Sequence, residues 1–106
     1  AVGGGRAHAL RVEANGSLVE INSVDTLGSS VFLEISRDGR WALSASYRDS
    51  SLAVLPINAD GSLSDAADSK LHRAPLNPAL ADRQEVCHPH QIRLDPQTNQ
   101  WALSCD

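Results

Sequence analysis

The sequence contains no methionine, no run of basic residues and no apolar stretch near the roughly 20 residues that a membrane-spanning helix needs. Its first residues carry neither the basic region nor the apolar region of a secretory signal peptide. Nine Lys and Arg are scattered among thirteen Asp and Glu, for a formal net charge of −4. Without a basic stripe, nucleic acid is not an expected partner. We therefore predict a soluble protein that binds neither membranes nor nucleic acid.

Cysteine is scarce as well. The two residues present, Cys87 and Cys105, are too few for a disulfide framework, and neither lies in a CxxC or another metal-ligand spacing. They are expected to be free thiols in or near a core, a pattern that slightly favours the cytoplasm. No Asp or Glu pair stands at a recognisable metal-ligand spacing from the histidines. The sequence thus predicts no metal and no other cofactor.

Convincing helix signals are absent, and short β-strands separated by tight turns account for most of the chain. The apolar, β-branched segment 31–35 ends at a turn that contains Gly39, where a positive φ is favoured. Three further strands are expected at residues 41–46, 52–57 and 69–73. Four short strands joined by such turns are typical of one blade of a β-propeller.

Two internal repeats support this interpretation. Residues 10–18 (Leu-Arg-Val-Glu-Ala-Asn-Gly-Ser-Leu) align with residues 55–63 (Leu-Pro-Ile-Asn-Ala-Asp-Gly-Ser-Leu). The tetrapeptide Trp-Ala-Leu-Ser at 41–44 recurs at 101–104, each time after an apolar strand and an Asp-containing turn. A repeat of about 40–50 residues built from four strands indicates a propeller blade. A generic antiparallel meander with coincidental repeats is the alternative.

The repeats divide the chain into parts of three blades. The fold expected for residues 1–106 is all-β, a partial β-propeller with one complete four-stranded blade at 30–73. Residues 6–26 are the expected outer strands of the preceding blade, and 88–105 the inner strands of the next. Residues 74–87, rich in Pro and polar residues, are expected to form an inserted loop. The chain is then a piece of a larger propeller, and we expect it to be inactive by itself.

Four histidines are the first candidates for chemistry. His8 and His72 stand alone in strand-like segments and are expected at the surface or at a sheet edge. His88 and His90 follow the long loop, and the loop 47–51 should reach the same face of the propeller, at the mouth of its channel. We expect one of this pair to face the channel and the other to be structural. From the residues alone, catalysis and a structural role both stay open, and metal binding is the less favoured alternative.

Residues 83–96 carry an Arg-Gln, a His-x-His and an Asp-Pro in that order. This run resembles the signature of the lactonase family of seven-bladed β-propellers. The phrases at 35–41, 52–57 and 60–63 are similar to the blade pattern of the same family. Its members include propeller-type 6-phosphogluconolactonases and carboxy-cis,cis-muconate cyclases. The resemblance spans nearly the whole chain and is most specific in the His-x-His region.

The resemblance implies roles for individual residues. His90 matches the histidine before the Asp-Pro that the cyclases use, and Arg83 lies in the loop that flanks the site, so these two are the expected catalytic residues. The expected substrate-binding residues are His88, Gln84, Glu85 and Arg48. Two departures from the family lie at the end of the second strand. Ser46-Tyr47 replaces the Asn-Tyr of many members, and Arg48 stands where small residues are commoner.

The function implied by the resemblance is hydrolysis of a sugar lactone such as 6-phosphogluconolactone. His90 would activate water, and Arg83 would stabilise the developing oxyanion or hold a phosphate or carboxylate. A carboxy-muconate cyclase, in which the same histidine moves a proton next to a carboxylate, is one alternative. A non-catalytic propeller that serves as a binding scaffold is the other. The full-length protein is expected to be a monomer with a small-molecule lactone substrate and no essential metal.

Overall fold

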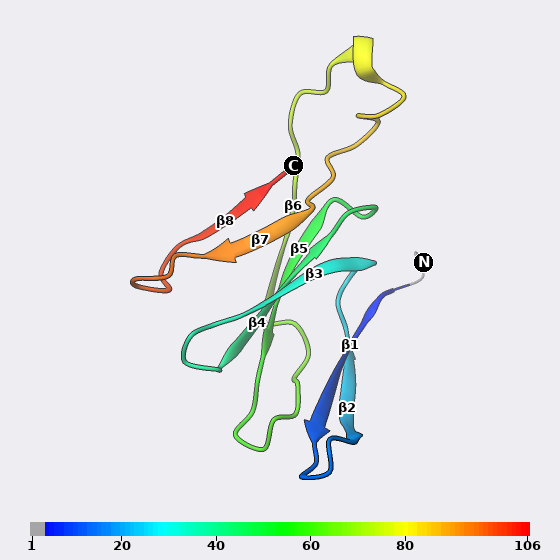
Figure 1. The fold of residues 1–106 in the computed structure, drawn as a ribbon. Helices are drawn as coiled ribbons and strands as arrows, with labels where there is room; N and C mark the ends of the chain where they lie inside the picture. The colour runs from blue at the N-terminus through cyan, green and yellow to red at the C-terminus, as the bar shows by residue number, and fades with distance from the viewer. Residues whose placement is uncertain (1–3) are drawn as a thin grey trace.

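The computed structural model describes residues 4–106, which contain eight β-strands and one short 3₁₀ helix (Figure 1). The strands are β1 (Arg6–Val12), β2 (Leu18–Asp25), β3 (Ser30–Ile35), β4 (Trp41–Ser46), β5 (Ser51–Pro56), β6 (Asp68–Leu71), β7 (Gln91–Leu94) and β8 (Ala102–Cys105). The helix η1 (Pro78–Leu80) lies in the long connection between β6 and β7. Residues 1–3, at the start of the expected partial propeller, lie outside the described residues.

Hydrogen bonds join neighbouring strands into three antiparallel sheets. β3, β4, β5 and β6 form a four-stranded meander, while β1–β2 and β7–β8 form two-stranded sheets. β5 and β6 each begin one residue earlier than the sequence indicated. The turn after β4 is tight enough for Ser51 to pair with Ser46 directly across it. The all-β prediction, with one complete four-stranded blade and strands of its two neighbours, is confirmed.

The repeated sequences form the same turn twice. Gly16, in the β1–β2 hairpin, has a φ of 83°, and Gly61, after β5, has a φ of 84°. Each glycine amide donates to the carbonyl three residues before it at 2.9 Å. The side-chain oxygens of Asn15 and Asp60 each accept a hydrogen bond from the serine amide two residues later at 3.0 Å. Because glycine adopts a positive φ without a steric penalty, the Asn-Gly and Asp-Gly pairs determine both turns.

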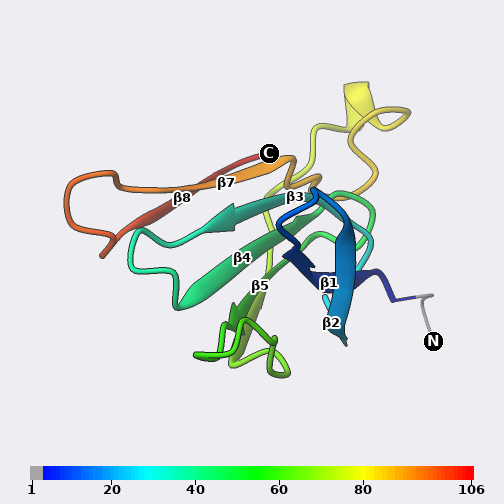
Figure 2. The same ribbon diagram turned by 60° about the horizontal axis from the view of Figure 1, so that its bottom comes forward.

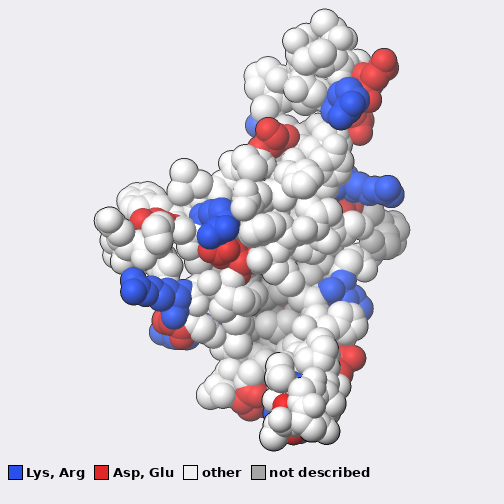
Figure 3. Space-filling model, in the orientation of Figure 1, with Lys and Arg blue, Asp and Glu red and all other residues white. Residues whose placement is uncertain are grey.

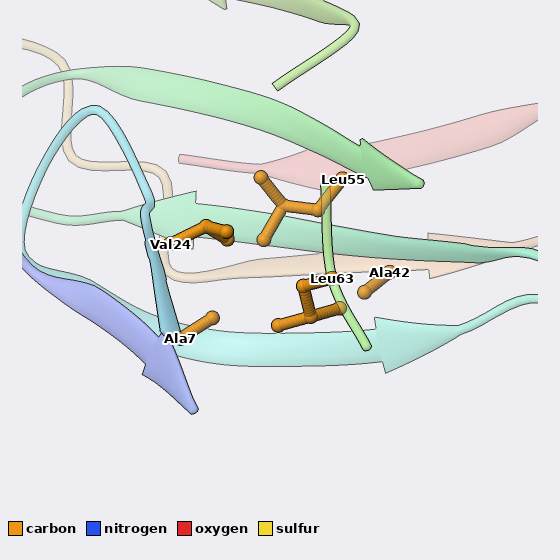
Figure 4. Packing of buried hydrophobic residues seen from close by; sticks show 5 residues of the cluster. All are labelled: Ala7, Val24, Ala42, Leu55 and Leu63. Carbon is orange, nitrogen blue, oxygen red and sulfur yellow. The ribbon is translucent and has the colours of Figure 1, made fainter. Parts of the chain in front are cut away.

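The four-stranded sheet is packed on both faces (Figure 2). The buried residues on the face toward the β1–β2 hairpin are Ala7, Val24, Ala42, Leu55 and Leu63 (Figure 4). Leu55 is completely enclosed there, with 0% of its surface exposed. The Asn22 side chain fastens the hairpin to the segment after β5, because its amide donates to the Leu63 carbonyl at 2.7 Å and its oxygen accepts from the Leu63 amide at 2.9 Å.

The opposite face of the sheet packs against β7. Ile92 of β7 is buried with Leu43 and Ala45 of β4. An ion pair between Arg93 Nε and Glu34 Oε2, at 3.3 Å, links β7 to β3 beside this core. Successive side chains of a strand point to opposite faces of its sheet, so neighbouring residues of β4 and β5 divide between the two cores. The central blade is therefore held from both sides by strands distant in sequence.

One face of β3 carries a row of exposed apolar side chains. Val31, Leu33 and Ile35 of β3 point away from β7, and each is about half exposed. The β1–β2 hairpin packs on β4 and β5 and leaves this row of β3 free. Such a row is typical of a sheet that packs against a further sheet.

Charged side chains are interspersed over the surface. On the face shown in Figure 3, Lys and Arg lie singly or beside Asp and Glu, and no broad area carries one sign of charge. Within residues 4–106, no helix combines the length and the apolar character that crossing a membrane requires.

Candidate active site

Two connections meet at one end of the central sheet. These are the turn after β4, residues 47–50, and the connection from β6 to β7, residues 72–90 (Figure 1). The Ser50 hydroxyl donates to the Cys87 carbonyl at 2.6 Å, and the His72 amide donates to the Ser50 carbonyl at 2.6 Å. Both connections lie at the same end of the four-stranded sheet, so the turn and the histidine-bearing loop are adjacent, as expected from the sequence.

The two connections line an open hollow of about 290 Å³. Residues of chemical interest on its walls are Tyr47, Arg83, Gln84, Cys87, His88 and His90. Four of the six residues expected at the site are thus brought together here. Glu85, the fifth, contacts His88 through its carboxylate.

Arg48, the sixth expected residue, lies apart from the others. It lines a separate hollow, next to Asp25 and Asp49, on the side of the β1–β2 hairpin. The turn is held toward the β1–β2 hairpin because the Asp49 carboxylate accepts a hydrogen bond from the Ser29 amide at 2.6 Å. A contact between Arg48 and a substrate in the first hollow therefore stays a prediction that the described residues do not support.

His88 and His90 both line the first hollow. Residues two apart on an extended chain lie on the same side of it, so both can reach this hollow, and the expectation that only one of them faces the channel stays a prediction. The segment is extended before β7 begins at Gln91, and the His90 amide donates to the Cys105 carbonyl at 3.0 Å. The two imidazoles therefore reach one space from neighbouring positions.

The His88 ring is held at both nitrogens. Nδ1 lies 3.0 Å from the Tyr47 carbonyl oxygen, and Nε2 lies 3.3 Å from Glu85 Oε1. A carbonyl can only accept, so Nδ1 carries a proton, and a carboxylate opposite Nε2 favours a second proton there. The backbone amide of His88 also donates to Asp106 Oδ1 at 2.6 Å. His88 is a fixed ring in surroundings that favour its charged form.

These contacts alter the acid–base behaviour of the group. The Tyr47 carbonyl first, and the Glu85 carboxylate with it, raise the pKa of His88 above its ordinary value, although partial burial opposes them. The pKa of Glu85 is lowered by its own backbone amide and by His88. The pKa of Asp106 is lowered, chiefly by the hydrogen bond from the His88 amide. These contacts therefore favour the charged form of His88 over its neutral form.

A pH-dependent contribution of His88 to stability follows. A raised histidine pKa contributes stability that is complete below the ordinary value of 6.5 and is lost as the pH rises through the folded-state pKa. The stability contributed by Glu85 is complete above the ordinary carboxyl pKa of 4.5 and is lost as the pH falls through the lowered pKa of Glu85. We therefore expect the melting temperature of wild type to exceed that of His88→Gln most clearly between pH 4.5 and 6.5.

Thermal melts of the complete protein containing this chain, followed at several pH values, measure this difference. The control is Glu85→Gln, which keeps the Tyr47 carbonyl and should reduce the pH dependence without abolishing it. A wild-type advantage over His88→Gln that stays the same, or grows, above pH 6.5 would contradict the expectation.

The His90 ring is less constrained by its contacts than the His88 ring. Its side chain is exposed, and within residues 4–106 its ring lies near Tyr47 only through an edge-to-face contact, with 5.5 Å between the ring centroids and 87° between the planes. An accessible imidazole can take up and release a proton.

Cys87 and Asp106 are neighbours that the sequence did not single out. The Cys87 thiol is buried and hydrogen-bonded to Asp106, which raises the pKa of the thiol, so it is protonated and a poor nucleophile. Cys105, in contrast, is exposed in the described part of the chain. Across residues 4–106, no three His, Cys, Asp or Glu side chains group in a way that could hold a metal ion. Only contacts across the fold, and no local motif, could have indicated Asp106.

Known proteins resemble this chain over nearly its whole length. Proteins named 6-phosphogluconolactonase from Pectobacterium atrosepticum and Pectobacterium carotovorum are each 35% identical to it, over 98 and 99 residues that make up 92% of this chain. The chain spans about a quarter, 26%, of the length of these curated relatives.

The similarity extends to structure and to the family. The periplasmic gluconolactonase of Pseudomonas aeruginosa superposes with a TM-score of 0.82 at 33% identity, covering 95% of this chain and 28% of that one. The family model described as lactonase, seven-bladed beta-propeller, matches residues 2–106. With its blade, its paired histidines and this match across the sequence, the chain belongs to the lactonase family of seven-bladed β-propellers.

Proposed function

We propose that the complete protein containing this chain hydrolyses a sugar lactone such as 6-phosphogluconolactone. The observation that best supports this is the placement of the exposed His90 imidazole and the Arg83 side chain on the walls of one open hollow. A base and a permanent cation beside a space of small-molecule size suit ester hydrolysis, in which water is activated and an oxyanion is stabilised. The names of the curated relatives agree with that chemistry.

The proposed mechanism uses His90 twice. As a neutral base, His90 takes a proton from water while the water oxygen bonds to the carbonyl carbon of the lactone. The Arg83 guanidinium stabilises the negative charge that develops on the carbonyl oxygen. The ring C–O bond then breaks, and the protonated His90 returns its proton to the departing alkoxide. The product is the open hydroxy acid, and His90 is neutral again.

The remaining residues of the hollow would bind the substrate. Gln84 offers an amide to sugar hydroxyls, and Glu85 a carboxylate. The charged form of His88 would attract a phosphate or carboxylate group of the lactone. We further propose a monomeric protein that needs no metal, and, from its two unpaired cysteines, a cytoplasmic location.

Acid release from 6-phosphogluconolactone and a small panel of other lactones tests the function. We expect the complete wild-type protein to hydrolyse at least one of them at an undiminished rate in the presence of a chelator. Loss of activity with the chelator, restored by a metal, would overturn the metal-free mechanism. A well-folded wild type without turnover of any lactone would overturn the function itself, and a muconate assay would then separate a cyclase from a scaffold.

A further inference from the structure

Tyr47 contacts both histidines of the hollow. Its ring is stacked on the His88 imidazole, with 4.1 Å between the centroids and 10° between the planes. The same ring meets His90 nearly at a right angle, at 5.5 Å and 87°. Its backbone carbonyl accepts the hydrogen bond from His88 Nδ1 at 3.0 Å. One residue thus touches His88 twice and His90 once.

The place of Tyr47 in the fold makes it a rigid support. It follows β4 directly, and the preceding residue, Ser46, is buried and paired with Ser51 across the turn. The turn is joined to the histidine loop through Ser50 and the Cys87 carbonyl. The Tyr47 ring is itself half-buried in the wall of the hollow. A ring attached to the sheet in this way can orient two side chains that stand on a long connection.

We propose that Tyr47 is a positioning residue that gives the two histidines different roles, holding His88 as a fixed cation and orienting His90 as the base. This inference rests on the proposed lactone hydrolysis for its kinetic part only. Its structural part, the orientation of the two rings and the charged form of His88, stands on the contacts in the hollow.

The physical basis differs for the two rings. An aromatic face within about 6 Å of a cation attracts it, so the stacked geometry favours the imidazolium form of His88. The other charged groups that face His88 are the carboxylates of Glu85 and Asp106, and His72 approaches Asp106 at 3.9 Å from the far side. The edge-to-face contact with His90 involves no hydrogen bond, so it restricts the orientation of that ring and leaves its nitrogens available.

The test compares Tyr47→Leu with Tyr47→Phe in the complete protein containing this chain. Leucine keeps the backbone carbonyl and removes the ring, while phenylalanine keeps the ring and removes only the hydroxyl. Imidazole NMR titrations, assigned with His88→Gln and His90→Gln, should show that Tyr47→Leu lowers the pKa of His88 toward its ordinary value and that Tyr47→Phe does not. Tyr47→Leu should lower kcat/KM about three- to tenfold, mainly through kcat, as expected for one lost aromatic contact.

Either of two results overturns the inference. One is an unchanged His88 titration in Tyr47→Leu. The other is a loss of activity in Tyr47→Phe as large as in Tyr47→Leu, which would place the role in the hydroxyl. If Tyr47→Leu does not fold, Tyr47→Met provides the same comparison with a flexible side chain. A wild type that hydrolyses no lactone contradicts the proposed function, while the titration still decides whether Tyr47 controls the histidines.

Discussion

Replacing His90 with alanine in the complete protein is expected to lower kcat/KM for lactone hydrolysis by about a hundredfold or more, the usual cost of removing a general base. The loss should lie in kcat, because in the proposed mechanism the exposed His90 ring acts on water and on the leaving alkoxide and contributes little to substrate binding. The open hollow around it leaves room for a small molecule. Added imidazole should therefore restore part of the activity of His90→Ala, measured as acid release.

The matched control is His8→Ala, which removes an imidazole from the exposed surface of β1, where it contacts Glu20. It should leave kcat/KM within about twofold of wild type, since it lies outside the hollow. A His90→Ala variant that keeps most of the wild-type rate would remove His90 from the mechanism. If His88→Ala were inactive while His90→Ala stayed active, His88 would be the general base and His90 the binding residue.

Replacing Leu55 with alanine is expected to destabilise the protein by about 2–5 kcal/mol, the range for deletion of a fully enclosed leucine side chain. Leu55 is 0% exposed between the β1–β2 hairpin and the central sheet (Figure 4). Its neighbours Val24 and Leu63 come from two other segments, so filling the space left by the side chain requires those segments to move. Denaturant unfolding of the complete protein measures the change.

Leu80→Ala is the control because it deletes the same atoms from an exposed residue of η1. Its backbone carbonyl still accepts from the amides of Arg83 and Gln84, so the cost should stay within about 0.5 kcal/mol. If Leu55→Ala cost no more than Leu80→Ala, the core between the hairpin and the blade would contribute little to stability.

The strands were predictable because their signals are local. Alternation of buried side chains, as in β5, and glycine at a positive φ, as in Gly16 and Gly61, involve residues a few positions apart. The repeats also indicated how the chain divides into blades, since similar sequences form similar turns. The ends of β5 and β6 were off by a residue or two because strand ends depend on pairing across the turn, which the sequence of one strand does not contain.

The site was predictable only as a set of residues. The run from Arg83 to His90 indicated the family and the chemical groups, because a motif is a property of neighbouring positions. Which imidazole is held and which is available depends on Tyr47, 41 residues away from His88 in the chain. The position of Arg48 at a separate hollow depends on the hydrogen bond that the Ser29 amide donates to Asp49, and the protonation of the Cys87 thiol depends on Asp106. Such contacts arise only when the chain folds, because folding, and not the order of residues, brings groups that are distant in the sequence within hydrogen-bond distance.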